Sequence, residues 1–134
     1  MKKIFSIILC LTTCFSLKAQ TQVYRYEAVA VAVGTVTDVP ETYQWTDWME
    51  TEIPVFINPG SGLVEINSTI NQRFIGVTAI QLPLFTDYPL LRKVKATDSE
   101  GKVCSLVFYR DEDGVRNICI HYSDIALCYC LLPY

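Results

Sequence analysis

Four cysteines and one histidine in the last third of the chain have the most distinctive chemistry: Cys104, Cys119, His121, Cys128 and Cys130. In an exported protein an even number of cysteines is typical of disulfides. A tight turn at Ser123-Asp124 would place Cys119 directly opposite Cys128 on two antiparallel strands, at a separation that a disulfide can span. We therefore predict a disulfide between these two residues. The alternative is that all four cysteines remain small, buried apolar side chains.

Strand alternation also predicts which side chains share a face. A two- or four-residue turn at 111–114 would put Cys104 on the face of Cys119 and His121, and Cys130 would lie there too, opposite Asn117. A three- or five-residue loop would move Cys104 to the other face. The face without cysteines is the predicted core face, with Ile118, Ile120, Tyr122, Ile125, Leu127, Tyr129 and Leu131. The cysteine face is also apolar, so we expect it to be covered as well; its further members are Leu106, Phe108, Ala126 and Leu132.

Neither a metal site nor a catalytic site is predicted. Cys128 and Cys130 are closer together than the cysteines of a structural zinc site. No serine or carboxylate stands in a recognisable order relative to His121. The acidic run 111–114 lacks the ligand spacing of a calcium loop and is typical of a hairpin turn. We therefore expect a protein that is not an enzyme and that needs no cofactor.

Three aromatic residues near the start of the second predicted strand are the candidate ligand-binding residues: Tyr43, Trp45 and Trp48. Clustered aromatic side chains at the mouth of a barrel can bind an apolar ligand or a sugar ring. The alternative is that they form a lid that packs over the core.

Short runs rich in β-branched and aromatic residues, separated by turn residues, predict an all-β fold. These runs are 23–33, 47–57, 63–66, 71–80, 91–97, 102–110, 115–122 and 125–132. Short links favour antiparallel pairing in sequence order, a single meander of about eight strands. Such a meander would close into a small closed or partly open barrel, and a two-sheet β-sandwich is the alternative. The longer connection 81–90 has room for one helical turn.

The first 19 residues resemble a secretory signal peptide. Two lysines precede an apolar run from Ile4 to Leu17, which is shorter than the ~20 residues that cross a bilayer as a helix. Ala19 supplies the small residue that cleavage requires, so we predict a signal peptide over 1–19 and a single β-domain over 20–134. Lipid attachment at Cys14 is the alternative, but Thr13 fits that motif poorly.

Charge limits the partners of the mature domain. The chain has 11 Lys and Arg residues, three of them within 1–19, and 14 Asp and Glu residues, all after it. The mature domain is therefore acidic and has no basic cluster, which argues against binding to nucleic acid or to anionic lipid. No second apolar run is long enough for a transmembrane segment.

Several short motifs together resemble small exported β-proteins of unknown function from Gram-negative bacteria: Trp45-x-Asp47-Trp48, Gln72-Arg73-Phe74, Asp98-x-x-Gly101-x-x-Cys104 and Ile118-x-Ile120-x-Tyr122. The overall pattern is also similar to lipocalin-like (calycin) barrels. That resemblance implies a barrel that holds a small apolar ligand, and it implies no activity.

We therefore predict an exported, non-enzymatic β-barrel domain, periplasmic or extracellular, that binds a small apolar ligand or a protein partner. The alternative is a structural, envelope-associated protein that self-associates through its sheet, with a homodimer as the simplest form.

Overall fold

The structure, a computed structural model, describes residues 22–39, 42–68 and 71–134. The described residues form ten strands: β1 (Tyr24–Val36), β2 (Tyr43–Trp45), β3 (Met49–Asn58), β4 (Leu63–Asn67), β5 (Asn71–Gly76), β6 (Thr86–Asp87), β7 (Arg92–Thr97), β8 (Val103–Arg110), β9 (Arg116–His121) and β10 (Ile125–Pro133). The predicted signal peptide, its cleavage site after Ala19 and the alternative lipidation site at Cys14 lie outside the described residues.

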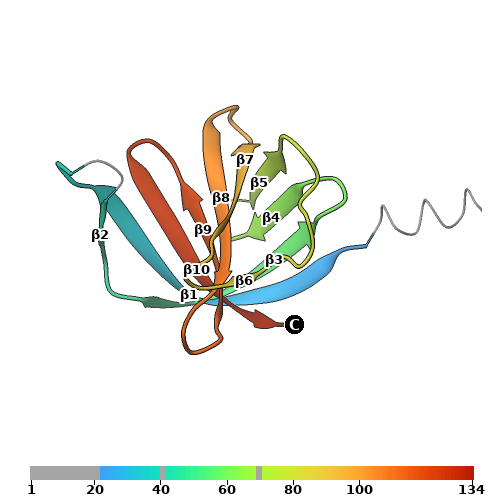
Figure 1. Ribbon diagram of the computed structural model, residues 1–134, viewed down its shortest axis with the longest axis horizontal. Coiled ribbons are helices and arrows are strands. Elements are labelled where there is room, and N and C mark those ends of the chain that lie inside the picture. The colour runs from blue at the N-terminus through green and yellow to red at the C-terminus, as the bar shows by residue number, and fades with distance from the viewer. Residues whose placement is uncertain (1–21, 40–41, 69–70) are drawn as a thin grey trace, which may run out of the picture.

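Eight of the strands close into an antiparallel barrel (Figure 1). The ring follows the order β1-β3-β4-β5-β7-β8-β9-β10, and β10 pairs back onto β1. Each ring strand corresponds to one of the eight predicted runs, so the all-β meander and its closure are confirmed and the β-sandwich alternative is not. Every ring strand has a partner on both sides, although β5 and β7 pair through only two residues of each strand.

Two short strands lie outside the ring. β2 pairs with the far end of β1, whereas β6 runs parallel to the end of β8. Both occupy segments that were predicted as connections, 34–46 and 81–90, and 81–90 contains no helix. The predicted run 71–80 ends early, at Gly76. Strands of two or three residues are too short for alternation to be visible in the sequence.

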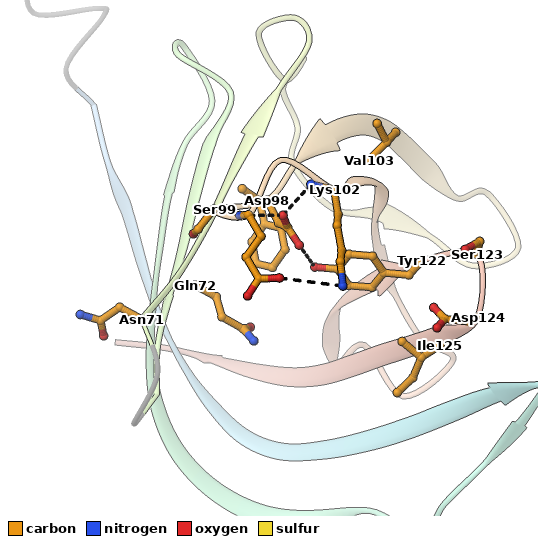
Figure 2. Close-up of a pocket in the computed structure, with 12 residues that line it drawn as sticks. Asn71, Gln72, Asp98, Ser99, Lys102, Val103, Tyr122, Ser123, Asp124 and Ile125 are labelled. Carbon is orange, nitrogen blue, oxygen red and sulfur yellow. Dashed lines mark hydrogen bonds and ion pairs between the residues drawn. The ribbon is translucent and has the colours of Figure 1, made fainter.

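The β7–β8 turn is built around one carboxylate. Asp98 Oδ1 accepts hydrogen bonds from the backbone N–H groups of Glu100 (2.9 Å) and Lys102 (2.8 Å), as Figure 2 shows in part. Gly101 has a φ of 82°, the left-handed conformation that favours glycine. The backbone N–H of Gly101 also donates to the carbonyl of Asp98. The result is a three-residue hairpin loop, a type I turn followed by a left-handed residue.

The β8–β9 turn repeats this arrangement. Asp111 Oδ1 accepts from the backbone N–H groups of Asp113 and Val115, both at 3.0 Å, and Gly114 has a φ of 81°. The loop therefore has three residues, 112–114, between the paired residues Asp111 and Val115. A three-residue loop shifts the register between β8 and β9 by one position relative to the two- or four-residue turn predicted from the sequence.

This shift corrects the predicted placement of Cys104, which was wrong. Leu106 pairs with Ile120, so Cys104, Leu106 and Phe108 face the barrel interior and are buried there. The four cysteines therefore do not share one face. Val107 takes the predicted place of these residues on the outer face, opposite Cys119.

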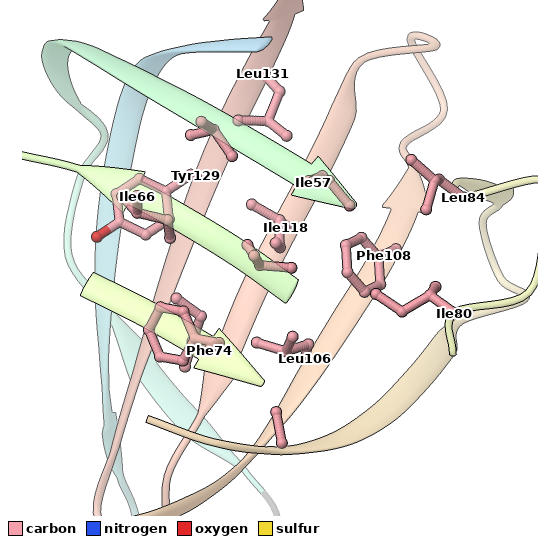
Figure 3. Packing of buried hydrophobic residues seen from close by; sticks show 14 of the residues in the cluster. Ile57, Ile66, Phe74, Ile80, Leu84, Leu106, Phe108, Ile118, Tyr129 and Leu131 are labelled. Atoms are coloured by element: carbon pink, nitrogen blue, oxygen red, sulfur yellow. The ribbon is translucent and has the colours of Figure 1, made fainter. Parts of the chain in front are cut away.

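The interior of the barrel is filled with side chains. Figure 3 shows large apolar residues from strands on all sides of the ring pointing toward one another. Those with almost no exposed surface include Val55, Ile57, Val64, Ile66, Phe74, Leu106, Phe108, Ile118, Ile120 and Leu131. An eight-stranded barrel is just wide enough for side chains to fill it. A binding site is therefore expected on the outer surface or at the ends of the barrel rather than in the lumen.

Candidate functional site

Cys119 and Cys128 form a disulfide on the outer face of the barrel. They are direct partners across β9 and β10, as the turn at Ser123-Asp124 predicted. Both are buried and pack with Val107 and Tyr109 in a small cluster separate from the barrel core. The predicted pairing is confirmed, and the disulfide fixes the centre of the outer face.

Among the described residues, the other two cysteines, Cys104 and Cys130, are free thiols that are protonated at neutral pH. Burial raises the pKa of the Cys104 thiol to about 11. Burial, with the nearby carboxylate of Asp111, also raises the pKa of Cys130, whose thiol donates a hydrogen bond to Asn117 Oδ1 (3.3 Å). Because only the thiolate is a good nucleophile, neither cysteine has the environment of a reactive one.

Outward-facing residues of β7, β8 and β9 form the floor of a groove. Paired residues on neighbouring strands point to the same face, so they form rows across the sheet. One row contains Lys93, Val107, Cys119, Cys128 and Ala32. The next contains Lys95, Ser105, His121, Ala126 and Gly34. Both rows end in small residues on β10 and β1, which leave room for larger groups above them.

Strand β2 uses that room to form the first wall. Trp45 pairs with Gly34, and its indole ring lies over that glycine. A Cβ atom added at Gly34 would lie only 3.0 Å from the Trp45 ring. Tyr43 reaches further, with its ring centroid 5.0 Å from that of His121 in an edge-to-face arrangement. Its hydroxyl donates a hydrogen bond to the backbone carbonyl of Tyr122 (3.3 Å). Residue 34 must therefore be small for Trp45 to lie flat against the barrel.

The second wall is the segment before β7. The backbone N–H of Tyr88 donates to the carbonyl of Arg110 (2.8 Å), and Asp87 forms an ion pair with the same arginine (3.0 Å). The Tyr88 ring lies beside that of Tyr109, with centroids 6.3 Å apart. Leu91 follows on the same wall. The outer face is therefore partly covered from within the chain, although Leu132 on β10 remains 49% exposed.

Between the two walls lies a groove with a volume of about 760 Å³. This volume is within the range of small-molecule sites, roughly 300–1,000 Å³. Of the three candidate ligand-binding residues, Tyr43 and Trp45 line the groove and Trp48 does not. The aromatic cluster lies against the outer face of the barrel rather than at its mouth.

His121 is the central polar group of the groove floor. Burial lowers its pKa, and the positive charge of Lys93 lowers it further, so the imidazole is neutral at pH 7. Ser105 lies directly opposite His121, a neighbour that the sequence order did not suggest. None of the described residues that line the groove is an aspartate or glutamate. The Ser105–His121 pair therefore lacks the carboxylate that orients the histidine in a catalytic triad.

A second cavity, of about 550 Å³, opens at the end of the barrel near the β7–β8 turn (Figure 2). The Tyr122 hydroxyl donates to Asp98 Oδ2 (2.8 Å), and Lys102 forms an ion pair with Glu100 (3.8 Å). Burial and the Asp98 carboxylate raise the pKa of Tyr122. Burial alone would raise the pKa of Asp98, but hydrogen bonds from the Lys102 backbone and the Tyr122 hydroxyl lower it. These groups bond to one another, so their arrangement stabilises the turn.

Comparison with family models, with curated proteins and with solved structures gave no match. Among the described residues, no group of three or more His, Cys, Asp or Glu side chains is placed to hold a metal ion. The same part of the chain contains no helix that is long and apolar enough to cross a membrane.

Proposed function

We propose that this protein is an exported, non-enzymatic binding protein whose outer groove binds a small ligand with a flat, largely apolar ring. The observation that carries the proposal is the groove between two aromatic walls, with Tyr43 and Trp45 on one side and Tyr88 on the other. Aromatic side chains that line a groove bind rings through apolar burial and stacking. Sparse polar groups on the floor, Ser105 and His121, would orient the ligand.

Packing supports the groove over the lumen as the binding site. Phe74 and Phe108 fill the interior, so a ligand could enter only by displacing core side chains. The groove needs no such displacement. Trp45 is 42% exposed, so a bound ring would cover apolar surface that water now contacts.

Export is part of the proposal. The disulfide supports it, because structural disulfides persist in oxidising compartments and are rare in the cytosol. The signal-like segment 1–19 agrees with this assignment. The intact mass of the protein recovered from a Gram-negative host tests it. We expect a chain that begins at Gln20, and an unprocessed or lipid-bearing chain would contradict this assignment.

The binding site is tested with phenylnaphthylamine, an uncharged fluorescent probe with two aromatic ring systems. We expect its fluorescence to rise on binding to the folded protein, and we expect Trp45→Ala to weaken binding at least tenfold. Trp48→Ala is the matched control, since Trp48 is 52% exposed but lies outside the groove. Equal losses in the two variants, or no binding by the unaltered protein, would refute the proposal.

A further inference from the structure

The groove has a charge opposite to that of the protein as a whole. The chain carries 14 acidic and 11 basic residues, yet no acidic side chain is found among the described residues of the groove lining. Lys93 lines the groove, and Lys95 points to the same outer face one row away. Since His121 is neutral at pH 7, these lysines supply the positive charge.

The lysines and the rings of Tyr43 and Trp45 lie on different sides of the groove floor. Lys93 belongs to β7, whereas the Tyr43 ring lies against His121 on β9. Neighbouring strands are about 4.8 Å apart, so β7 and β9 are separated by about 10 Å. This distance is close to the length of a small fused-ring or two-ring molecule. A ring stacked at Tyr43 and Trp45 would therefore present a substituent on its far side to Lys93.

Resting on the proposed function, we propose that the groove selects ligands that carry a single anionic group on the flat ring, with the anion placed at Lys93 and Lys95. A carboxylate, sulfonate or sulfate would meet the lysine ammonium groups, while Ser105 and His121 lie beside it as hydrogen-bonding groups. Among the described residues no acidic side chain lines the groove, and Asp87 in the second wall is paired with Arg110. A cationic ring would meet the like charge of Lys93, so the same arrangement selects against it.

The direct test compares two probes with the same rings, anilinonaphthalene sulfonate and the uncharged phenylnaphthylamine. We expect the sulfonate to bind about tenfold more tightly at pH 7, and Lys93→Gln combined with Lys95→Gln to abolish that preference. Lys102→Gln, which changes a lysine at the mouth cavity, is the matched control and should leave the preference intact. Lys93→Met with Lys95→Met repeats the test should the glutamine variant fold poorly.

The outcomes separate the two proposals. Equal affinity for the two probes, or a preference that survives in the double variant, overturns the anion inference while ring binding stands. If Trp45→Ala weakens the binding of neither probe, the proposed function itself is overturned.

The source of the anionic ring is assigned by competition against bound anilinonaphthalene sulfonate. Displacement by naphthoate but not by galacturonate, each with one carboxylate, assigns an aromatic acid, whereas displacement by galacturonate alone would contradict a flat, largely apolar ring. Displacement by uncharged naphthalenemethanol at the same concentrations as naphthoate would contradict anion selection.

Discussion

The inner and outer faces of β8, β9 and β10 are made from alternate residues of the same three strands, yet they are packed in different ways. On the inner face Leu106, Phe108 and Ile118 are completely buried in the barrel core. On the outer face the disulfide and Val107 are buried in a smaller cluster, which is flanked by half-exposed aromatic walls. The inner face is packed with apolar side chains, whereas the outer face has a groove of about 760 Å³. Under the proposed function, the inner face therefore provides stability and the outer face provides the binding site.

Truncation of neighbouring residues on the two faces should give the largest contrast. Phe108→Ala removes a fully buried ring from the core and should lower the free energy of unfolding by about 3–5 kcal/mol. Val107→Ala, on the outer face of the same strand, should lower it by only about 1–2 kcal/mol. Urea unfolding of both variants measures the difference. Comparable losses would mean that the outer cluster is a second structural core.

Removal of the disulfide should have the next largest effect. The bond joins residues nine positions apart, so the Cys119→Ser/Cys128→Ser variant should lose about 2–3 kcal/mol of stability through greater freedom of the unfolded chain. Cys130→Ala, on the same strand, is the control and should lose less than about 1 kcal/mol. Peptide mapping without reductant provides the chemical check. Free thiols at both positions in exported protein would show that the outer face lacks this constraint.

The smallest expected effect is a pH dependence that belongs to the outer face. The folded protein holds the pKa of His121 below its usual value of 6.5, through burial and the charge of Lys93. The unfolded chain therefore binds the proton at higher pH, and stability should fall as the pH drops from about 6.5 through the folded-state pKa. His121→Gln should flatten the stability profile in this window. An unchanged profile in that variant would assign the dependence to other groups.

The fold was predictable because its main signals are local. Eight alternating runs and their turns gave the eight ring strands, and the Ser123-Asp124 turn gave the Cys119–Cys128 register. The face of Cys104 was predicted wrongly because the β8–β9 loop has three residues rather than the two or four that were predicted. A change of one residue in loop length moves every side chain of the strand to the opposite face. The repeated pattern of aspartate, two residues and glycine at Asp98 and Asp111 was the signal that could have resolved it.

The site was less predictable than the fold. Tyr43 and Trp45 were identified as an aromatic cluster, but their position depends on β2 lying across Gly34, a contact between strands that alternation does not encode. The second wall depends on Tyr88 and on β6, a strand of only two residues. Residues of the floor such as Ser105 and Lys93 become neighbours of the aromatic rings only when the register of four strands is known.

Mapping of the bound probe onto the backbone tests the central claim most directly. Isotope-labelled protein is titrated with anilinonaphthalene sulfonate, and amide chemical shifts are followed by NMR. We predict that the largest changes occur on the outer face, at Lys93, Val107 and His121, with little change at Asp98 and Gln72 in the mouth cavity. Changes concentrated at Asp98 and Gln72, or spread through the barrel core, would contradict the assignment of recognition to the outer groove.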